Sequence, residues 1–210
     1  MVLRPHDLLA LRRPPVLSES ESAPSWVARA LEEAPFVIVR RDRLSPCSIP
    51  VGVRGLERGQ RWACSIDSQE VIAVIRPDEL INARSVADPA REREIPALRQ
   101  FRILIEKWER FHYRWGPFGS VSFELATGLR CCRPSSDLDL AIYPSRRIDL
   151  SFAAHLLNSL SDSLTRVDIL VETSVGAFSL AEYARADSNR ILLRTCNGSR
   201  LVRDPWSTET

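Results

Sequence analysis

The sequence has 210 residues, 44% of them hydrophobic, which is enough apolar material for one large domain or two small ones. Its formal net charge is only +2, so the composition argues against a partnership with long nucleic acids, which favour strongly basic surfaces. Charged residues interrupt the first positions and no apolar run approaches the roughly 20 residues of a membrane span, so we expect a cytoplasmic protein without a membrane partner.

The first 81 residues are predicted to form a small β-rich domain. Helical spacing over 26–31 predicts a short helix that ends before Pro35, and the serine- and glutamate-rich stretch 18–22 before it is expected to be a solvated loop. Runs of β-branched and aromatic residues predict strands at 36–39, 49–55 and 61–66. The short run 71–75 is consistent with a fourth strand or with the start of a helix.

Arginines gather near the ends of these strands. One interpretation is a solvated basic edge, and the other is a phosphate-binding surface that faces the second domain, because a guanidinium offers planar, forked donors to phosphate oxygens. For the second case we expect a triphosphate or nucleotide to be held by Arg54, Arg58 and Arg61.

Residues 82–95 are polar, rich in both charges, and are predicted to be a linker. A second domain then covers 96–210. It opens with a long amphipathic helix from Pro96, in which Leu98, Phe101, Leu104 and Trp108 recur at three- and four-residue spacing. We expect further helices at 121–127, 148–160 and 178–184, and strands at 136–142, 167–171 and 190–194. The whole pattern predicts an α+β protein whose second domain has a mixed sheet flanked by helices.

Two acids lie in the first half of the strand predicted at 136–142. Asp137 and Asp139 are two positions apart, so their side chains point to one face, while Leu138, Leu140 and Ile142 point into a core. Like charges this close repel unless a cation lies between them, and carboxylate oxygens suit Mg²⁺ (or Mn²⁺). The alternative is a strand end with solvated acids.

Neighbouring residues add to the metal interpretation. Gly119-Ser120 precedes a helix, where a glycine allows close backbone approach and helix-terminal amides bind phosphate. Asp168, on a second apolar strand, is a candidate third metal ligand or the base that accepts a proton.

The remaining reactive side chains carry no clear chemistry. The five cysteines are odd in number and contain no CxxC pair, so neither a disulfide framework nor a zinc site is expected, and Cys131-Cys132 has no assigned role. For His6 and His112 a structural role is the expectation.

A glycine-serine turn, a helix, an Asp-x-Asp strand and a third Asp resemble the polymerase-β-type nucleotidyltransferase superfamily, although the gap from Ser120 to Asp137 is longer than usual. A closer resemblance is to the phosphoribosyl-dephospho-CoA transferases of malonate decarboxylase systems, also called malonate decarboxylase holo-acyl carrier protein synthases. The segments that resemble this family run through the whole chain: 4–8 (RPHDL), 50–55 (PVGVRG), 58–61 (RGQR), 115–120 (WGPFGS), 123–128 (FELATG), 136–140 (SDLDL), 171–173 (VET), 176–178 (GAF), 192–195 (LLRT) and 204–206 (DPW).

The resemblance implies a nucleotidyltransferase-like catalytic domain and a specific reaction. The family transfers the 2'-(5''-phosphoribosyl)-3'-dephospho-CoA group from its 5''-triphosphoribosyl precursor to a serine of the acyl carrier subunit of malonate decarboxylase, and diphosphate leaves. By motif, Asp137 and Asp139 match the catalytic metal-binding pair and Gly119-Ser120 the phosphate-holding turn.

Two other functions stay open at this point. The first is another metal-dependent nucleotidyltransferase, acting on a nucleotide, RNA or a protein hydroxyl. The second is a non-catalytic module that binds a carrier protein and whose acids only support the fold.

Overall fold

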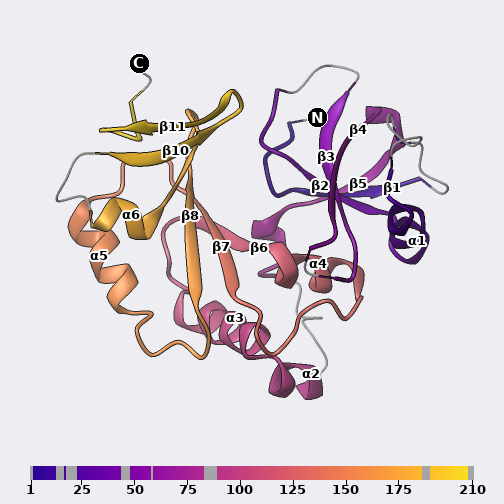
Figure 1. Cartoon of the computed structure of the whole chain (residues 1–210). Helices are drawn as coiled ribbons and strands as arrows, with labels where there is room; N and C mark the ends of the chain where they lie inside the picture. The colour runs from indigo at the N-terminus through magenta and orange to yellow at the C-terminus, as the bar shows by residue number, and fades with distance from the viewer. Residues whose placement is uncertain are drawn as a thin grey trace.

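The computed structural model of the chain describes residues 2–12, 17, 23–43, 48–57, 59–82, 89–185 and 190–207. Two β-sheets stand side by side as two lobes, an N-terminal lobe from indigo to purple and a C-terminal lobe from magenta to yellow (Figure 1). Helices accompany both sheets, so the predicted α+β class is confirmed. The predicted loop at 18–22 lies outside the described residues. Within the described part of the chain no helix has the length and apolarity to cross a membrane.

The N-terminal lobe is an antiparallel sheet with strand order β4-β3-β2-β1-β5. Its elements are β1 (Leu8–Leu11), α1 (Trp26–Glu33), β2 (Phe36–Val39), β3 (Ile49–Arg54), β4 (Arg61–Ile66) and β5 (Val71–Ile75), with the short 3₁₀ helices η2 (Ser68–Glu70) and η3 (Pro77–Glu79). The three strands predicted at 36–39, 49–55 and 61–66 are therefore confirmed, and 71–75 is a strand.

Strand β1 is absent from the sequence prediction. All four of its residues are buried, because the strand lies inside the sheet between β2 and β5. Leu9 and Leu11 pack into the core beneath α1, whereas Leu8 packs on the opposite face, toward the C-terminal lobe. A strand buried on both faces shows no alternation of apolar and polar residues, so periodicity could not identify it.

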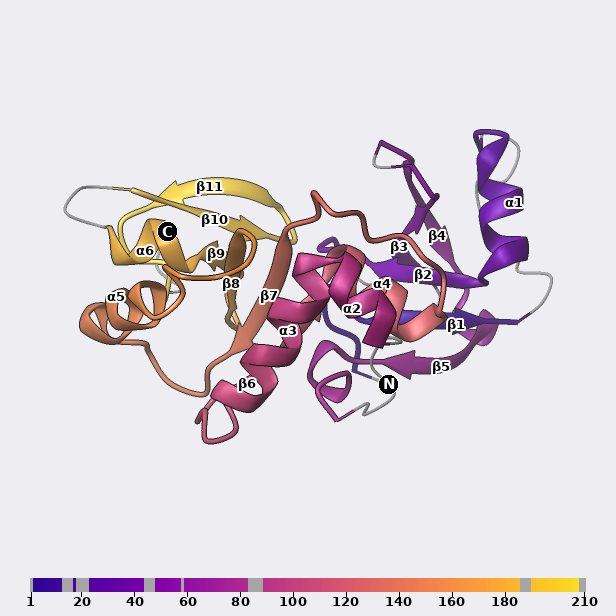
Figure 2. The same ribbon diagram turned by 90° about the horizontal axis from the view of Figure 1, so that it is seen from below.

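The C-terminal lobe is a mixed sheet with strand order β11-β10-β9-β8-β7-β6, in which β7 and β8 are parallel. Its strands are β6 (Arg114–Phe118), β7 (Leu138–Tyr143), β8 (Val167–Glu172), β9 (Ala177–Ser179), β10 (Ile191–Thr195) and β11 (Gly198–Val202). Helices α3 (Pro96–Lys107), α5 (Leu150–Asn158) and α6 (Leu180–Ala184) share a buried core with Leu138, Leu140 and Ile142 of β7. Figure 2 shows α3 crossing beneath this sheet.

Several predicted elements differ from the structure. Residues 114–118, for which no element was predicted, form the edge strand β6, where Pro117 is tolerated. Residues 177–179 begin as strand β9 before the helix α6, and β11 was not predicted, because its residues are mostly exposed. The predicted helix 148–160 is shorter, since Asp149 caps α5 in an extended conformation. The linker expected at 82–95 contains helix α2 (Pro89–Glu94). The domain limits themselves stay a prediction.

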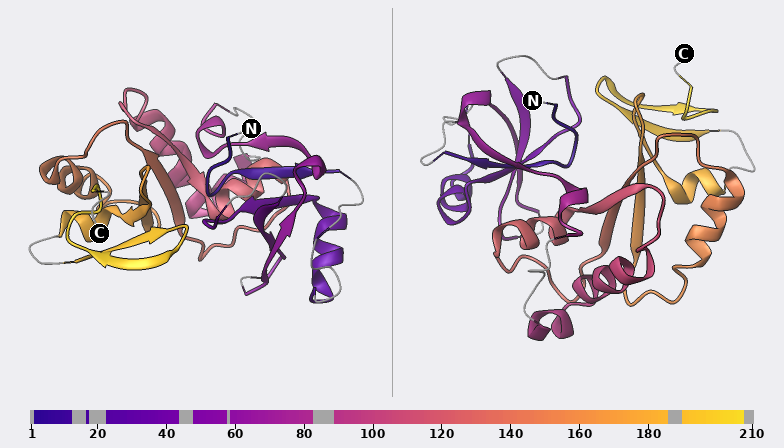
Figure 3. Two further views of the ribbon diagram at one scale, coloured as in Figure 1. Left: turned by 90° about the horizontal axis from the view of Figure 1, so that it is seen from above. Right: turned by 180° about the vertical axis from the view of Figure 1, so that it is seen from behind.

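Helix α4 (Gly119–Thr127) lies between the two lobes, as Figures 1 and 3 both show. The predicted end of this helix at Gly128 is confirmed, with a left-handed φ of 74°. A small buried cluster joins it to the N-terminal sheet through Leu8, Phe123 and Cys131. Packing of α4 against both lobes therefore sets where the residues at its start lie relative to the N-terminal sheet.

Candidate active site

The two central parallel strands of the C-terminal sheet bring two of the predicted acids together. Asp139 on β7 and Asp168 on β8 are register partners, so their side chains leave the same face of the sheet, opposite the helices. We call this surface the acid face. Asp137 precedes β7 by one residue and lines the same pocket as Asp139, as expected from its spacing.

The acids at this site are electrostatically unfavourable to one another. Burial raises the pKa of Asp139, and the carboxylates of Asp168 and Asp137 raise it further, to about 6, against the opposing effect of Arg61 and His6. A carboxyl group whose charge is opposed by burial and by two like charges is a favourable place for a cation.

The Gly119-Ser120 turn lies directly against these acids. Gly119 starts α4 with a φ of 71°, and a Cβ at this position would come within 2.6 Å of Asp139 Oδ2. Only glycine accommodates both the left-handed conformation and the adjacent carboxylate. The helix begins two residues earlier than the predicted 121, so Ser120 lies in its first turn and lines the pocket with the acids.

The N-terminal lobe supplies the basic side of this pocket. Arg54 at the end of β3 and Arg61 at the start of β4 are cross-strand partners, and both line a hollow of about 90 Å³ that we call the acid pocket. The acid pocket also contains Ser120, Asp137 and Asp139. Two nitrogens of Arg54, Nε and Nη1, are buried and have no hydrogen-bond partner among the described residues. Buried donors without partners indicate a missing acceptor, such as a phosphate oxygen.

Two predicted residues stand apart from this group. Arg58 lies outside the described residues. The side chain of Asp168 is 44% exposed, and its Oδ1 accepts hydrogen bonds from Arg166 Nε and Nη2 at 3.1 and 3.0 Å. Sequence spacing placed Asp168 on the correct face, but the pairing with Arg166 two positions away depends on side-chain conformation.

A metal ion at the acid pocket would be held by Asp137 and Asp139, whose oxygens are the ligands Mg²⁺ prefers. The raised pKa of Asp139 and the shared pocket fit such an ion. The three aspartates do not form a cluster whose oxygens all lie within 4.8 Å of one another; over the described ranges only Glu124, Cys131 and Cys132 do so.

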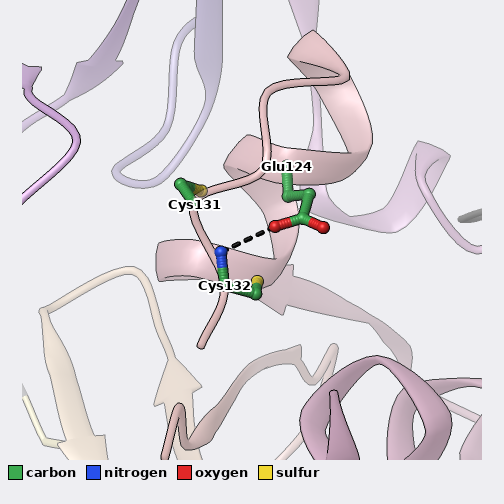
Figure 4. A group of neighbouring side chains, drawn as sticks. All are labelled: Glu124, Cys131 and Cys132. Atoms are coloured by element: carbon green, nitrogen blue, oxygen red, sulfur yellow. Dashed lines mark hydrogen bonds between the residues drawn. The ribbon is translucent and has the colours of Figure 1, made fainter. Parts of the chain in front are cut away.

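Figure 4 shows that second cluster, in which Glu124 on α4 lies against the loop residues Cys131 and Cys132. Glu124 Oε2 accepts a hydrogen bond of 2.6 Å from the Cys132 amide, and its two oxygens accept bonds from Arg91 Nε and Nη2 at 2.8 and 3.3 Å. Arg91 Nη2 also donates to the Cys132 carbonyl at 2.6 Å. Burial alone would raise the pKa of Glu124, but the bonds from Arg91 and Cys132 hold it below its usual value. The carboxylate is fully occupied, so it fixes the loop before Asp137 to α4 and is not a metal site.

His6, for which a structural role was expected, lies between the two lobes. Its φ is 75°, unusual for a residue other than glycine, and its ring stacks on Phe118 with centroids 4.2 Å apart. Its Nε2 lies 3.2 Å from Glu172 Oε1, which also forms an ion pair with Arg41. Burial favours protonation of Glu172, but His6 and Arg41 hold its pKa below the usual value. The RPHD string at 4–7 was the only sequence signal for this residue.

Comparison with known proteins covers almost the entire chain. Family models described as the phosphoribosyl-dephospho-CoA transferase MdcG N-terminal domain and C-terminal domain match residues 4–77 and 84–205. No solved structure matches.

Proteins named phosphoribosyl-dephospho-CoA transferase are similar over nearly their full length. The one from Pseudomonas syringae pv. tomato is 38% identical over 98% of this chain and 94% of its own. Those from Pseudomonas aeruginosa and Klebsiella pneumoniae strain 342 are 35% and 34% identical, over 96% and 98% of this chain and 93% and 97% of their own.

Proposed function

Because the chain belongs to the phosphoribosyl-dephospho-CoA transferase family, we propose that it moves the 2'-(5''-phosphoribosyl)-3'-dephospho-CoA group from its 5''-triphosphoribosyl precursor to a serine of the apo acyl carrier subunit of malonate decarboxylase. One observation carries this proposal. Arginines of the N-terminal lobe and acids of the C-terminal lobe line a single pocket with Ser120, which suits a triphosphate.

The chain's own residues supply the binding and positioning that phosphoryl transfer mainly requires. Arg54, with two buried unpartnered nitrogens, and Arg61 bind the phosphates that become diphosphate. Ser120 and the backbone amides at the start of α4 donate hydrogen bonds to an oxygen of the same triphosphate. The hydrogen bonds from Arg91 to Glu124 keep the loop that carries Asp137 in place.

Asp137 and Asp139 would hold Mg²⁺ or Mn²⁺, which when bound neutralises negative charge on the phosphates and on the leaving diphosphate. In the transfer itself, the serine oxygen of the carrier forms a bond to the phosphorus nearest the ribose. The bond from that phosphorus to the diphosphate oxygen breaks, and diphosphate leaves with its electron pair. We assign the serine proton to Asp168, which lies on the acid face and is partly exposed to an approaching carrier.

The family assignment makes the chain an enzyme, so a non-catalytic carrier-binding module is set aside. A nucleotidyltransferase with another acceptor would use the same acid pocket and differ only in its substrates. Substrate profiling therefore separates it from the proposed reaction.

The test combines the protein, Mg²⁺, the triphosphoribosyl precursor and apo carrier, with intact mass of the carrier as readout. We expect a mass gain equal to the transferred group, lost in Asp137→Asn and Asp139→Asn and kept in Asp162→Asn, an exposed acid in a turn far along the chain. A gain that survives both substitutions would refute the role of the acid pocket. Diphosphate release from another nucleotide, without modification of the carrier, would favour the other acceptor.

Three further variants separate binding from proton transfer. Replacing Arg54 by Ala should raise the KM for the precursor by about tenfold or more, the effect of losing hydrogen bonds between charged groups. Arg99→Ala, on the exposed side of α3, is the matched control. Asp168→Asn should abolish transfer while Mn²⁺ binding, followed by electron paramagnetic resonance, is retained; loss of Mn²⁺ binding would make Asp168 a ligand instead.

A further inference from the structure

The acid pocket is too small for the whole donor. Its volume is about 90 Å³, whereas sites for small molecules usually measure roughly 300–1,000 Å³. Two larger hollows continue from it in series, each sharing arginines with the one before. Arg54 and Arg61 also line a hollow of about 260 Å³ beside Trp62, and Arg40 lines both this hollow and one of about 490 Å³. We call this last one the distal pocket.

The distal pocket lies further along the acid face. Tyr143 is four residues beyond Asp139 on β7, and Glu172 is four residues beyond Asp168 on β8; both line the distal pocket. Even spacing keeps these side chains on one face of the sheet, and four residues of strand span about 13 Å. A ligand bound at the acids could thus extend across the sheet into the distal pocket.

Arginines outnumber acids among the residues that line the distal pocket. Two of its arginines are paired inside it: Arg41 forms an ion pair with Glu172, and Arg40 lies 3.7 Å from Asp42. The other two are Arg4 and Arg114, which lie 3.9 and 3.8 Å from a single acid, Asp78. Four arginines and two acids, Asp42 and Glu172, therefore line the distal pocket, and behind its wall Asp78 and the buried Asp7 add negative charge near Arg4. Three of the ion pairs are long, at 3.7–3.9 Å, so those guanidinium groups can turn toward an anion.

A buried hydroxyl points to a ligand independently of charge. Tyr143 is only 9% exposed, and its hydroxyl has no hydrogen-bond partner among the residues that the structure describes. The Arg4 guanidinium carbon lies 5.1 Å from the centre of its ring. Buried hydroxyls are nearly always bonded, so a hydroxyl left free at the wall of a pocket indicates an absent acceptor.

We propose that the distal pocket binds the diphosphate and pantetheine arm of dephospho-CoA, the part of the donor that does not react. Two linked ribose rings separate the reacting phosphorus from this second diphosphate, a separation of the same order as the distance along β7. The arginines and Tyr143 hold the diphosphate, and apolar residues at the rim, among them Leu3, Pro5 and Val39, contact the arm. This inference rests on the proposed function for the identity of the donor.

Binding of dephospho-CoA alone, measured by isothermal titration calorimetry, tests the pocket without any transfer. We expect Tyr143→Phe and Arg40→Ala each to raise the Kd for dephospho-CoA by about tenfold or more, the effect of losing a hydrogen bond to a charged group. The affinity for adenosine, which lacks the diphosphate and the arm, should not change. Arg29→Ala, an exposed arginine of α1, is the control and should bind as wild type does.

Steady-state kinetics of the full enzyme provide a second test of the distal pocket. The KM for the triphosphoribosyl donor should rise in both variants while the KM for the carrier and kcat at saturating donor stay the same. Unchanged Kd and KM values would overturn the proposal, as would a rise confined to the carrier's KM, which would make the pocket a docking surface. A further outcome separates the two proposals. If the wild type transfers no group but both variants still bind dephospho-CoA more weakly than the wild type does, the distal pocket is supported as a binding site and the proposed transfer reaction is refuted.

Discussion

Replacing Asp139 with Asn should stabilise the protein at neutral and alkaline pH when divalent cations are absent. Burial, Asp168 and Asp137 raise the pKa of Asp139 from 3.8 to about 6. The difference of roughly 2.2 pKa units, at 1.36 kcal/mol per unit, corresponds to about 3 kcal/mol of unfavourable free energy in the folded state. Asparagine has no charge and avoids this destabilisation.

The direction with pH follows from the raised pKa. The folded protein binds the Asp139 proton more tightly than the unfolded chain does, so this stabilisation is complete below pH 3.8 and is lost as the pH rises through 6. The advantage of Asp139→Asn should therefore be roughly half its full size at pH 5 and complete by pH 7 to 8.

Thermal unfolding in EDTA between pH 5 and 8 measures this difference. A gain of about 3 kcal/mol corresponds to a rise in Tm of about 6–12 °C for a chain of this size, and the variant should be inactive. The exposed Asp162→Asn should show no pH-dependent gain. An advantage of Asp139→Asn that does not grow with pH, or a variant less stable than wild type at pH 8, would refute the reasoning. Added Mg²⁺ should then stabilise wild type alone, by about 2.7 kcal/mol at a hundred times its Kd.

Three further predictions follow from buried contacts. Arg91→Met should destabilise the protein by about 3–5 kcal/mol in urea unfolding, because it leaves Glu124 buried and unpaired, and adding Glu124→Gln should restore part of that loss. Gly119→Ala should lower the transfer rate by about tenfold or more, whereas Gly128→Ala, which has a similar φ but open space around it, should lower stability without that loss of rate. Gly116→Ala should lower the yield of folded protein and destabilise it by about 3 kcal/mol or more, because its Cβ would meet the backbone of η3 at 2.0 Å; normal stability would contradict the close contact.

Most of the sheet strands could be predicted from the sequence because their residues alternate or form β-branched runs. The failures have a common physical origin, since each element depends on its neighbours more than on its own pattern. Strand β1 is buried on both faces, and β6 contains a proline that only an edge position allows. Helix α2 has no buried residue, so its sequence carries no apolar period.

In the candidate site, too, the sequence predicts what regular strand geometry fixes and misses what depends on packing between distant segments. Spacing alone placed Asp137 and Asp139 in one pocket and Asp168 on the same face, because strand geometry is regular. For Arg54 and Arg61 the sequence left open a solvated edge or a surface that faces the second domain, and only the structure places them opposite the acids. No sequence signal showed that His6 reaches Glu172. These contacts join residues far apart in the chain and depend on how the two lobes pack.

The two lobes contribute groups of opposite charge to the acid pocket: carboxylates from the C-terminal lobe and arginines from the N-terminal lobe. Asp139 on one side is held near acids that raise its pKa, and Arg54 on the other keeps two buried nitrogens without partners. Each feature is unfavourable in the folded protein, and under the proposed function each would be relieved by the opposite charge that a triphosphate and a divalent cation bring together. Arg61 and His6 of the N-terminal lobe offset only part of the unfavourable charge at Asp139, and the buried cluster around Leu8 and Phe123 fixes α4 against the N-terminal sheet beside them. The proposed function therefore requires that these unfavourable electrostatics become favourable binding free energy for a ligand that carries both charges, as a preorganised site for a metal–phosphate substrate would.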